Sequence, residues 1–462
     1  MVHDTNTHVA IVGSGAAGLS AAWLLAKRYK VTLLEKDSRL GGHAHTATVA
    51  VQDEPAQLQE SVIHEVRKID TGFIVYNEPS YPNMTRWFAS MGVDTEASDM
   101  SFAVSRDNGG FEYAGGPVLG LLAQPSLLLR LRFWRMLIDL LRFYRRASAQ
   151  IPQESEQTLG DFLRQYNYND AFIQDHLLPF GAAIWSTSKT NMLDYPAAAF
   201  IRFCTNHGLL QITNRPQWRT VSGGSEQYVK AVEKSLMPDS VITDFRVARI
   251  RRGVDSVSVF DSKGRCIDAD HVVIATHADQ ALACLEEPTE REHALLSVFG
   301  YDTNLAILHT DESYLPKRRR AWCSWNYVEK DGDSASQVSV SYWMNRLQNL
   351  SGSTNYIVSL NPSKLPSEQQ TYRSQAYQHP VFTPQTFRAQ QKLWQLQGQQ
   401  RTWFCGSYFG SGFHEDAVQA GLAVAEQLGG IARPWELENP SSRIVVPSTK
   451  LSEYRMSDEA IA

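Results

Sequence analysis

Three glycines near the start of the chain have the spacing G-x-G-x-x-G. An apolar run, residues 9–12, precedes them, and a segment of helix length rich in Ala and Leu, residues 19–27, follows. A strand that turns through such glycines into a helix leaves backbone N–H groups free at the helix N-terminus, where they can bind phosphate. The spacing therefore predicts a turn that binds a pyrophosphate. The residues expected to line it are Gly13, Ser14, Gly15, Ala16, Ala17 and Gly18.

A second apolar strand, residues 31–34, ends in the acid Glu35. An acid roughly 20 residues after the first glycine is placed to accept hydrogen bonds from ribose hydroxyls. The strand, turn, helix, second strand and acid all follow in the expected order. This favours a bound dinucleotide over a glycine turn that binds nothing.

The residues that follow Glu35 indicate which dinucleotide this is. Arg39 and the pair Gly41 and Gly42 complete the pattern E-x-x-x-R-x-G-G. An Arg can pair with a pyrophosphate, and two glycines allow the backbone to approach a bulky cofactor closely. The pattern resembles that of the FAD-binding flavoproteins of the amine oxidase, phytoene desaturase and protoporphyrinogen oxidase superfamily. The resemblance implies FAD, with Lys36 and His43 also bordering it.

A second FAD block is expected near the C-terminus. Residues 402–407 form a short apolar strand, and a helix begins at His414 and runs to about residue 428. In the resembled superfamily this helix directs its N-terminus at the flavin ring, where its partial positive charge favours the anionic reduced flavin. Ser407 replaces the acid or Thr that the family often has there. The residues expected on the flavin side are Gly406, Ser407, Phe413, His414 and Glu415.

Two further blocks match the same superfamily. In the first, residues 221–225 precede a helical stretch, 226–235, and an extended segment, 241–250, whose Val247 is expected against the adenine. The second, residues 270–277, reads as a buried parallel strand that ends near the cofactor, and Gly72 is also expected there. The combination of residues 70–74, 206–211 and 412–416 resembles a group of amine-oxidase-like flavoproteins often encoded beside, or fused to, cyclopropane fatty acyl synthases. That resemblance implies a small hydrophobic substrate, with a modified fatty acyl chain as the leading expectation, and a fatty acyl synthase-type enzyme as a partner.

The predicted fold is α/β, with a Rossmann-like FAD-binding domain and a discontinuous α+β substrate domain as in amine oxidases. We expect the FAD-binding domain in residues 1–85, 215–285 and 395–435, and the substrate domain in residues 86–214 and 286–394. Residues 436–462 are expected to form a C-terminal arm. The first insertion reads as mainly helical, clearest at residues 119–146 and 157–180. The second is rich in strands, at residues 304–309, 322–327, 337–343 and 356–360.

Composition limits the partners and the compartment. The 462 residues carry a net charge of −5, which argues against nucleic-acid binding. The five cysteines have no metal-site spacing and suit a reducing cytoplasm, where we expect the protein to be located. Residues 381–401 hold no Cys that could link covalently to a flavin, so we predict non-covalent FAD. The N-terminus has no signal peptide pattern, and no apolar run is long enough to span a membrane.

The stretch 119–146 combines Leu, Phe and Trp with six arginines. Such a segment can lie on an anionic membrane surface, which would make the protein peripheral. We favour the alternative of a substrate-domain helix whose arginines extend from a packed face.

Candidates for the substrate pocket carry weaker signals. They are His207, Trp185, Trp218 and Tyr342, although a His or an aromatic residue in such a context is more often structural. His43 and His45 form only a weak metal pattern, and we expect no metal.

The superfamily's reaction is the removal of a hydride from carbon onto flavin N5, which requires no separate acid or base. We therefore expect an FAD-dependent oxidoreductase. One alternative is an amine oxidase that uses oxygen. Another is a flavin-free lipid- or prenyl-binding chaperone of the same fold, which the intact FAD pattern disfavours. A reductase fed by NAD(P)H is disfavoured because no second strand–G-x-G-x-x-G–helix is present.

Overall fold

The computed structural model describes residues 7–50, 66–115, 118–152, 155–185, 189–211, 213–329 and 339–447. Its centre is a five-stranded parallel sheet drawn from three separated parts of the chain. In spatial order the strands are β10 (Val241–Ile242), β2 (Lys30–Leu34), β1 (His8–Val12), β14 (His271–Ile274) and β20 (Thr402–Phe404). In β1, β2, β14 and β20 every residue after the first is buried, as expected for parallel strands covered on both faces, whereas the edge strand β10 is half-buried.

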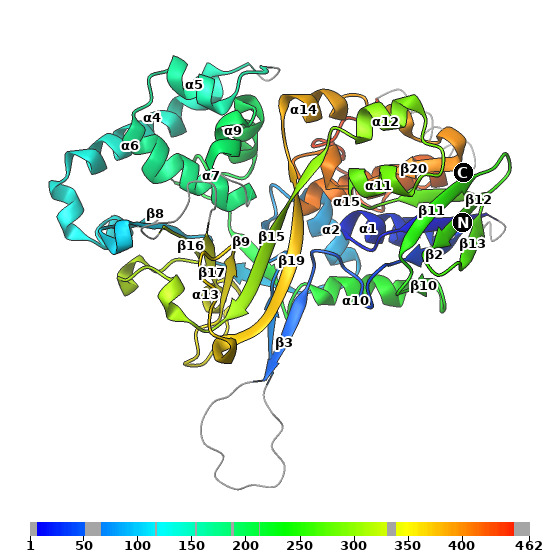
Figure 1. Ribbon diagram of the computed structural model, residues 1–462, viewed down its shortest axis with the longest axis horizontal. Helices are drawn as coiled ribbons and strands as arrows, with labels where there is room; N and C mark the ends of the chain where they lie inside the picture. The colour runs from blue at the N-terminus through cyan, green and yellow to red at the C-terminus, as the bar shows by residue number, and fades with distance from the viewer. Residues whose placement is uncertain are drawn as a thin grey trace, which may run out of the picture.

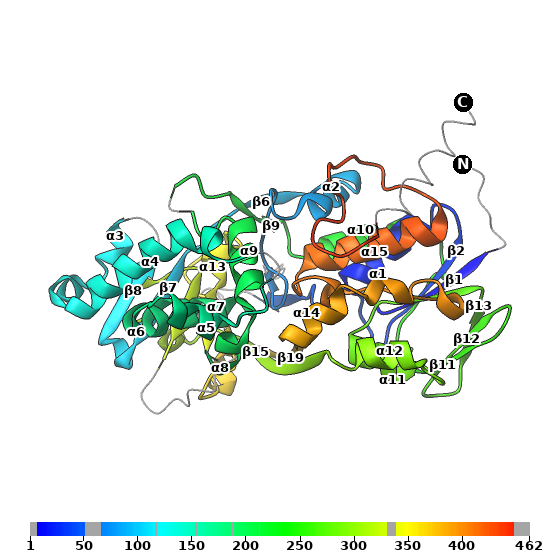
Figure 2. The same cartoon turned by 90° about the horizontal axis from the view of Figure 1, so that it is seen from above.

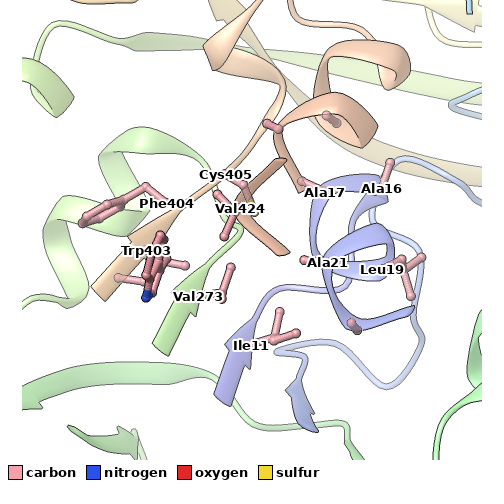
Figure 3. Packing of buried hydrophobic residues seen from close by; sticks show 14 of the residues in the cluster. Ile11, Ala16, Ala17, Leu19, Ala21, Val273, Trp403, Phe404, Cys405 and Val424 are labelled. Atoms are coloured by element: carbon pink, nitrogen blue, oxygen red, sulfur yellow. The ribbon is translucent and has the colours of Figure 1, made fainter. Parts of the chain in front are cut away.

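Helices α1 (Ala16–Leu25) and α15 (His414–Gly429) pack together against this sheet (Figure 3). Their backbones approach closely at Gly421, where a Cβ atom would lie 2.2 Å from the carbonyl oxygen of Ala17. Helices α10 (Glu226–Ser235) and α2 (Pro82–Ser90) contact α1 and α15 respectively. The opening and closing segments of the chain thus share one core.

Smaller sheets surround the cofactor domain. An antiparallel sheet contains β11 (Val247–Arg252), β12 (Val257–Asp261) and β13 (Cys266–Ala269). β3 (Thr46–Ala50) pairs with β4 (Val66–Asp70), and β9 (Trp218–Val221) pairs with both β5 (Tyr76–Asn77) and β6 (Thr95–Ser98). Helices α11 (Ala278–Cys284) and α12 (Glu290–Leu296) follow β14.

A mixed seven-stranded sheet forms the base of the second domain (Figure 1). Its order is β19 (Thr371–Val381), β15 (Gly300–His309), β18 (Ile357–Leu360), β17 (Val340–Trp343), β16 (Trp325–Val328), β7 (Phe102–Arg106) and β8 (Phe111–Gly115). The long pair β15 and β19 runs alongside the cofactor domain in Figure 1. The predicted α/β fold with an α+β second domain is therefore confirmed.

The first insertion is less helical than the sequence predicted, because its strands β7 and β8 join this sheet. The single helix expected over residues 119–146 is also wrong. The structure has α3 (Val118–Leu121), a 3-10 turn η2 (Pro125–Leu129) and then α4 (Leu131–Gln150). Pro125 lacks the N–H that a continuous helix would need at that position, so the chain restarts after it.

The second expected helix, over residues 157–180, is interrupted as well. α5 (Leu159–Gln165) ends before Asn167, which has φ 49°, and Asn169 then caps α6 (Asp170–Phe172). A π-helical turn, η3 (Ile173–Leu177), leads into α7 (Leu178–Trp185), and α8 (Lys189–Asp194) and α9 (Ala197–Asn206) follow. These helices cover one side of the second core (Figure 2).

The described part of the predicted C-terminal arm packs against the cofactor domain. The carbonyl oxygen of Pro440 accepts hydrogen bonds from the side chains of Asn83 and Arg433. Arg443 lies over the ring of Tyr81. Residues 448–462 of the arm lie outside the described residues. Among the helices that the structure describes, none is both long and apolar enough to cross a bilayer.

Candidate functional site

The glycine turn has the geometry that a bound pyrophosphate requires. Gly13 has φ +98°, and its N–H donates to the carbonyl oxygen of Leu34 over 2.8 Å. A Cβ atom at Gly18 would lie 1.9 Å from the carbonyl oxygen of Gly13, so helix and turn can approach only with glycine there. A Cβ atom at Gly15 would meet nothing within 4 Å, which leaves open space before the first turn of α1. Ala16 and Ala17 begin that turn, as predicted.

Glu35 ends β2 beside this turn. One oxygen of its carboxylate accepts from the N–H of Ser14 at 3.0 Å and from its hydroxyl at 2.5 Å. The other oxygen accepts from the N–H of Asp37 at 3.0 Å. The carboxylate is thus fixed at the edge of the site. Val247 lies close by, because the N–H of Phe245, two residues earlier, donates to the carbonyl oxygen of Glu35.

The glycine pair lies directly against the turn. The N–H of Gly41 donates to the carbonyl oxygen of Ser14 at 3.1 Å. A Cβ atom at Gly42 would lie 3.2 Å from the Cα of Gly15. His43 follows, and its carbonyl oxygen accepts from the N–H of Phe73 at 2.8 Å, which brings Gly72 against the same loop.

Arg39 has a role that the sequence did not indicate. Its guanidinium donates to the carbonyl oxygens of Leu40, Gly42 and Ala44 at 3.3, 2.9 and 3.2 Å. The side chain thereby fixes the loop that carries the glycine pair. Lys36 is exposed and pairs with Asp37 at 3.6 Å, so nothing in the structure directs it toward the turn.

Histidines from four segments gather at the carboxyl end of the parallel sheet. The ring centroid of His43 lies 6.3 Å from that of His277, which follows β14, and 5.4 Å from that of His379 in β19. Burial, together with the charges of His379, His277 and His414, holds the pKa of His43 well below its usual value. Burial also lowers the pKa of His379 to about 4. The described residues contain no group of His, Cys, Asp or Glu arranged to hold a metal.

The N-terminus of α15 reaches the same place. The ring of His414 stacks on Phe73 with centroids 3.9 Å apart, and burial lowers the pKa of His414 to about 3. Its Nε2 atom is buried with no hydrogen-bond partner in the described structure. An unpartnered buried nitrogen beside the open glycine turn fits a group that is recognised there.

Two other predicted flavin contacts make hydrogen bonds within the protein. Glu415 is fully buried, and its carboxylate accepts from the N–H groups of Asn83 and Met84 at 3.1 and 2.9 Å. It therefore caps the start of α2. The carbonyl oxygen of Ser407 accepts from the N–H of Gly410, within the loop that follows Gly406. A Cβ atom at Gly406 would lie 2.6 Å from the ring of Tyr408.

Three of the four pocket candidates are linked by an aromatic cluster. The ring of Phe413 lies 4.5 Å from Phe203 and 6.1 Å from Trp185. His207 stacks on Phe203 at 3.8 Å and lies 6.4 Å from Trp218. Tyr342 is not part of this group: it is buried in β17 and contacts Trp325 at 4.9 Å.

His207 is held on both sides of its ring. Its Nδ1 lies 2.9 Å from the carbonyl oxygen of Phe203, and its Nε2 accepts from Arg443 at 3.0 Å. Burial and the charge of Arg443 lower its pKa well below the usual value. A histidine fixed in this way is a structural link and not a free base.

Asp70 joins the two domains beside the site. Its carboxylate accepts from the N–H and hydroxyl of Ser225, from the hydroxyl of Thr46, and from the side-chain amide of Gln348 at 3.0 Å. Burial raises its pKa to about 7.

Comparison with known proteins decides the family. The family model described as flavin containing amine oxidoreductase matches residues 16–429. The chain belongs to this family. The family's description agrees with the flavin oxidoreductase that the sequence predicted, and the predicted cofactor class is confirmed.

Curated relatives include the L-amino-acid oxidase of Siganus canaliculatus, 27% identical over 335 residues, which are 67% of this chain and 58% of that protein. The L-amino acid oxidase of Cerastes cerastes is 25% identical over 63% of this chain and 55% of its own. The chain thus spans less than two thirds of the length of these relatives.

Solved structures share the fold. Cyclohexylamine oxidase from Brevibacterium oxydans IH-35A matches with a TM-score of 0.60 and 15% identity, over 91% of this chain and 99% of that one. A CLA-producing fatty acid isomerase from P. acnes matches with a TM-score of 0.59 and 15% identity, over 90% and 97%.

The described residues fit FAD. The open space before α1, the glycine pair that abuts it and the carboxylate of Glu35 would hold the adenosine and pyrophosphate parts. His43 and His414 would border the ring system.

The sequence predicted that the strand over residues 270–277 ends near the cofactor, but it did not single out His277 as a site residue. It missed His379. His379 lies on β19, a strand that the sequence reading did not detect.

Proposed function

We propose that the protein oxidises an apolar substrate by transfer of a hydride from carbon to N5 of FAD, with a modified or unsaturated fatty acyl chain as the substrate class. The bound flavin supplies the two-electron acceptor. The chain's own residues hold the substrate, exclude water and set the polarity around the reacting carbon.

The observation that carries this proposal is the aromatic cluster beside α15. Phe413 directly precedes His414 and packs on Phe203 and Trp185. The acids nearest to it are already engaged: Glu415 with α2, and Asp416 with the N–H of Phe413 at 2.8 Å. The cluster is therefore largely apolar, and an apolar chain is the ligand that a pocket bordered by it would favour.

The absence of a free base in the described part of the cluster agrees with this reaction. His207 is bonded at both nitrogens, and no proton need leave the substrate before its hydride is transferred. The neighbouring carbon then loses a proton to water as the new double bond forms. A partner enzyme of the fatty acyl synthase type would then supply or consume the acyl chain.

Anaerobic bleaching of the bound flavin tests the substrate class. Purified holoenzyme is mixed without oxygen with phospholipid bearing unsaturated or cyclopropane acyl chains, with cyclohexylamine, and with L-phenylalanine. We expect the visible absorbance of the oxidised flavin to be lost with the lipid alone. Bleaching by the amine or the amino acid alone would overturn the proposal.

A second candidate function is amine or amino acid oxidation with oxygen. The family's description and the names of its L-amino-acid oxidase relatives favour it. Release of peroxide with L-phenylalanine in air, at a rate equal to flavin reduction, would support this candidate over the first.

A further inference from the structure

The start of α4 carries an unusual concentration of exposed apolar side chains. Six of the eleven large hydrophobic side chains that are exposed in the described structure lie within residues 128–141. Leu129 is 90% exposed and Leu131 66%. The six are Leu128, Leu129, Leu131, Trp134, Ile138 and Leu141. We call them the η2–α4 patch.

The helix geometry makes this patch continuous. Within α4 its members follow one another at three, four and three residues, so they lie along one face. The opposite face packs into the core of the second domain through Phe133, Met136, Phe143 and Ala147. The helix is therefore apolar on two sides, and only one of them is covered by the protein.

Exposed arginines flank the patch and outnumber the exposed acids near the start of α4, Asp107 and Asp170. Arg130, Arg135, Arg145 and Arg146 are exposed, and no ion pair to them is found within the described residues. Asp139, the one acid in α4, is buried and accepts from the N–H of Asn169 at 2.7 Å. The exposed surface thus combines apolar side chains with uncompensated arginines.

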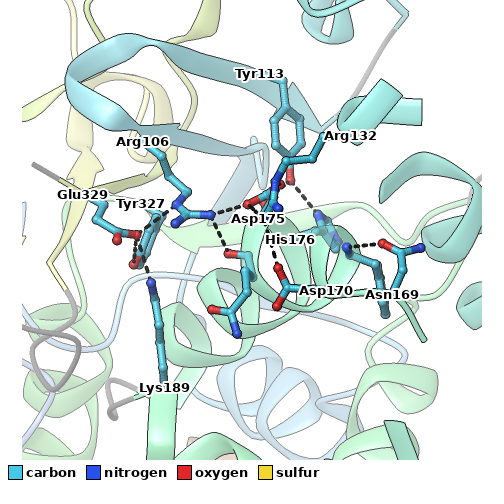
Figure 4. A network of polar contacts seen from close by, with 12 residues as sticks. Arg106, Tyr113, Arg132, Asn169, Asp170, Asp175, His176, Lys189, Tyr327 and Glu329 are labelled. Atoms are coloured by element: carbon cyan, nitrogen blue, oxygen red, sulfur yellow. Dashed lines mark hydrogen bonds and ion pairs between the residues drawn. The ribbon is translucent and has the colours of Figure 1, made fainter. Parts of the chain in front are cut away.

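A small cavity at the N-terminal end of α4 extends this positive surface. Its lining residues are Arg106, Asp107, Phe111, Arg130, Arg132 and Asp175. Figure 4 shows Arg106 and Arg132 both bonded to Asp175, and Arg132 donates to it from Nε at 2.7 Å. Arg106 also pairs with Glu329 at 3.1 Å. Arg130 has no such acid within the described residues.

The patch lies far from the cofactor site. α4 is at the left end of the molecule in Figures 1 and 2, with the parallel sheet at the other end. A protruding face is free to approach a flat surface without obstruction by the cofactor domain.

From these observations we propose that the η2–α4 patch docks on a bilayer that contains anionic phospholipid. Leu129, Leu131 and Trp134 enter the boundary between headgroups and acyl chains, and the flanking arginines bind lipid phosphates. A helix with one apolar face and a basic margin lies in the plane of such an interface. The protein's net charge is −5, so the attraction comes from this local surface and not from the whole molecule. The proposal does not depend on the substrate proposed above.

Vesicle flotation with the full-length holoenzyme tests the proposal. Vesicles of phosphatidylcholine alone are compared with vesicles that also contain phosphatidylglycerol. We expect the protein to float with the anionic vesicles and to be released as salt increases. The double variant Leu129→Ser and Ile138→Ser should bind at least about ten-fold more weakly. Arg135→Glu combined with Arg145→Glu should abolish the dependence on anionic lipid.

Met237→Ser is the matched control, since Met237 is 68% exposed on the cofactor domain and outside the patch. It should float as the native protein does. Because all the substituted side chains are exposed, flavin content and melting temperature should stay unchanged in every variant. The proposal would be overturned if the protein failed to float with anionic vesicles or floated equally with neutral ones. Full binding by the Leu129→Ser, Ile138→Ser variant would also overturn it. Failure to float combined with capture by an acidic protein would reassign the patch to a protein partner.

Discussion

At the residue scale, the carboxylate of Glu35 has two tasks. It fixes Ser14 in the glycine turn, and it lies where the ribose of FAD is expected. The first task is visible in the structure, whereas the second follows from the family. One carboxylate oxygen accepts from Ser14 in the turn and the other from the N–H of Asp37, so the side chain is fixed at the edge of the site.

We therefore predict that Glu35→Ala weakens FAD binding about ten-fold, or about 1.4 kcal/mol, because the ribose loses its acceptor and Ser14 loses its anchor. Titration of the deflavinated protein with FAD, followed by fluorescence quenching, measures this. Glu287→Ala, which alters an exposed acid outside the glycine turn, is the control. An unchanged dissociation constant would contradict the ribose assignment.

The buried histidines predict a dependence of stability on pH. Burial lowers the pKa of His379 to about 4, whereas the unfolded chain binds this proton near pH 6.5. Because the unfolded state binds more protons between these values, stability is full above pH 6.5 and is lost as pH falls toward 4. At pH 5.5 the loss is roughly 1 kcal/mol for each such histidine.

Melting temperatures are measured from pH 5 to 8. Toward acid pH they should fall less steeply for His379→Gln than for the native protein, because the variant takes up about one proton fewer on unfolding. His293→Gln is the control, since His293 is exposed. Identical acid-side slopes for the native protein and His379→Gln would show that His379 does not titrate on unfolding.

At the element scale, α15 and the residue before it contact three parts of the molecule that are distant from it in the sequence. Phe413 reaches the aromatic cluster, Glu415 caps α2, and Gly421 meets α1. The bounds of α10 and α15 could be predicted because apolar periodicity, glycines and caps are local signals, whereas α1 begins at Ala16, three residues before the predicted start. The partners of Glu415 could not, because Asn83 and Met84 are more than 300 residues away in the sequence.

The same distinction explains the errors in the first insertion. The strands β7 and β8 pair with each other as a hairpin across residues 107–110, and β7 also pairs with β16 from the second insertion. The Asn-Gly turn is a local hairpin signal that the prediction did not use, whereas the pairing with β16 has no local signal. The glycine turn was readable because all its parts are consecutive. The histidine cluster was not, because its members come from segments that the topology alone brings together.

The contact between α1 and α15 gives an element-scale prediction. In Gly421→Ala the new Cβ would lie 2.2 Å from a backbone oxygen of α1, so the helices must separate. We expect a loss of about 1–3 kcal/mol in the free energy of unfolding. In Gly429→Ala the nearest atoms are side-chain carbons of Ile431 and Leu25, at 3.0 and 3.2 Å, which can shift. Urea denaturation should show a clearly larger effect for Gly421→Ala, and equal effects would contradict the close approach.

At the scale of the whole molecule, two hydrophobic cores are joined by a polar contact. One core lies around the parallel sheet and the other beneath the helices of the second domain. Gln348 follows α13 (Met344–Leu347) of the second domain and bonds Asp70 twice. Its amide oxygen accepts from the Asp70 N–H at 2.9 Å, and its nitrogen donates to the Asp70 carboxylate at 3.0 Å.

Gln348→Ala would leave a buried N–H and a buried carboxylate oxygen each with one partner fewer, at a cost of about 1–3 kcal/mol. Since these bonds connect the two cores, we expect the variant to unfold in two steps during urea denaturation, followed by tryptophan and flavin fluorescence together. The native protein and Gln369→Ala, which alters an exposed glutamine, should show coincident transitions with both probes. If the two probes still coincide in Gln348→Ala and its urea midpoint equals that of the native protein, this contact does not couple the domains. The coupling would then be assigned to the packing of Phe413 against Phe203.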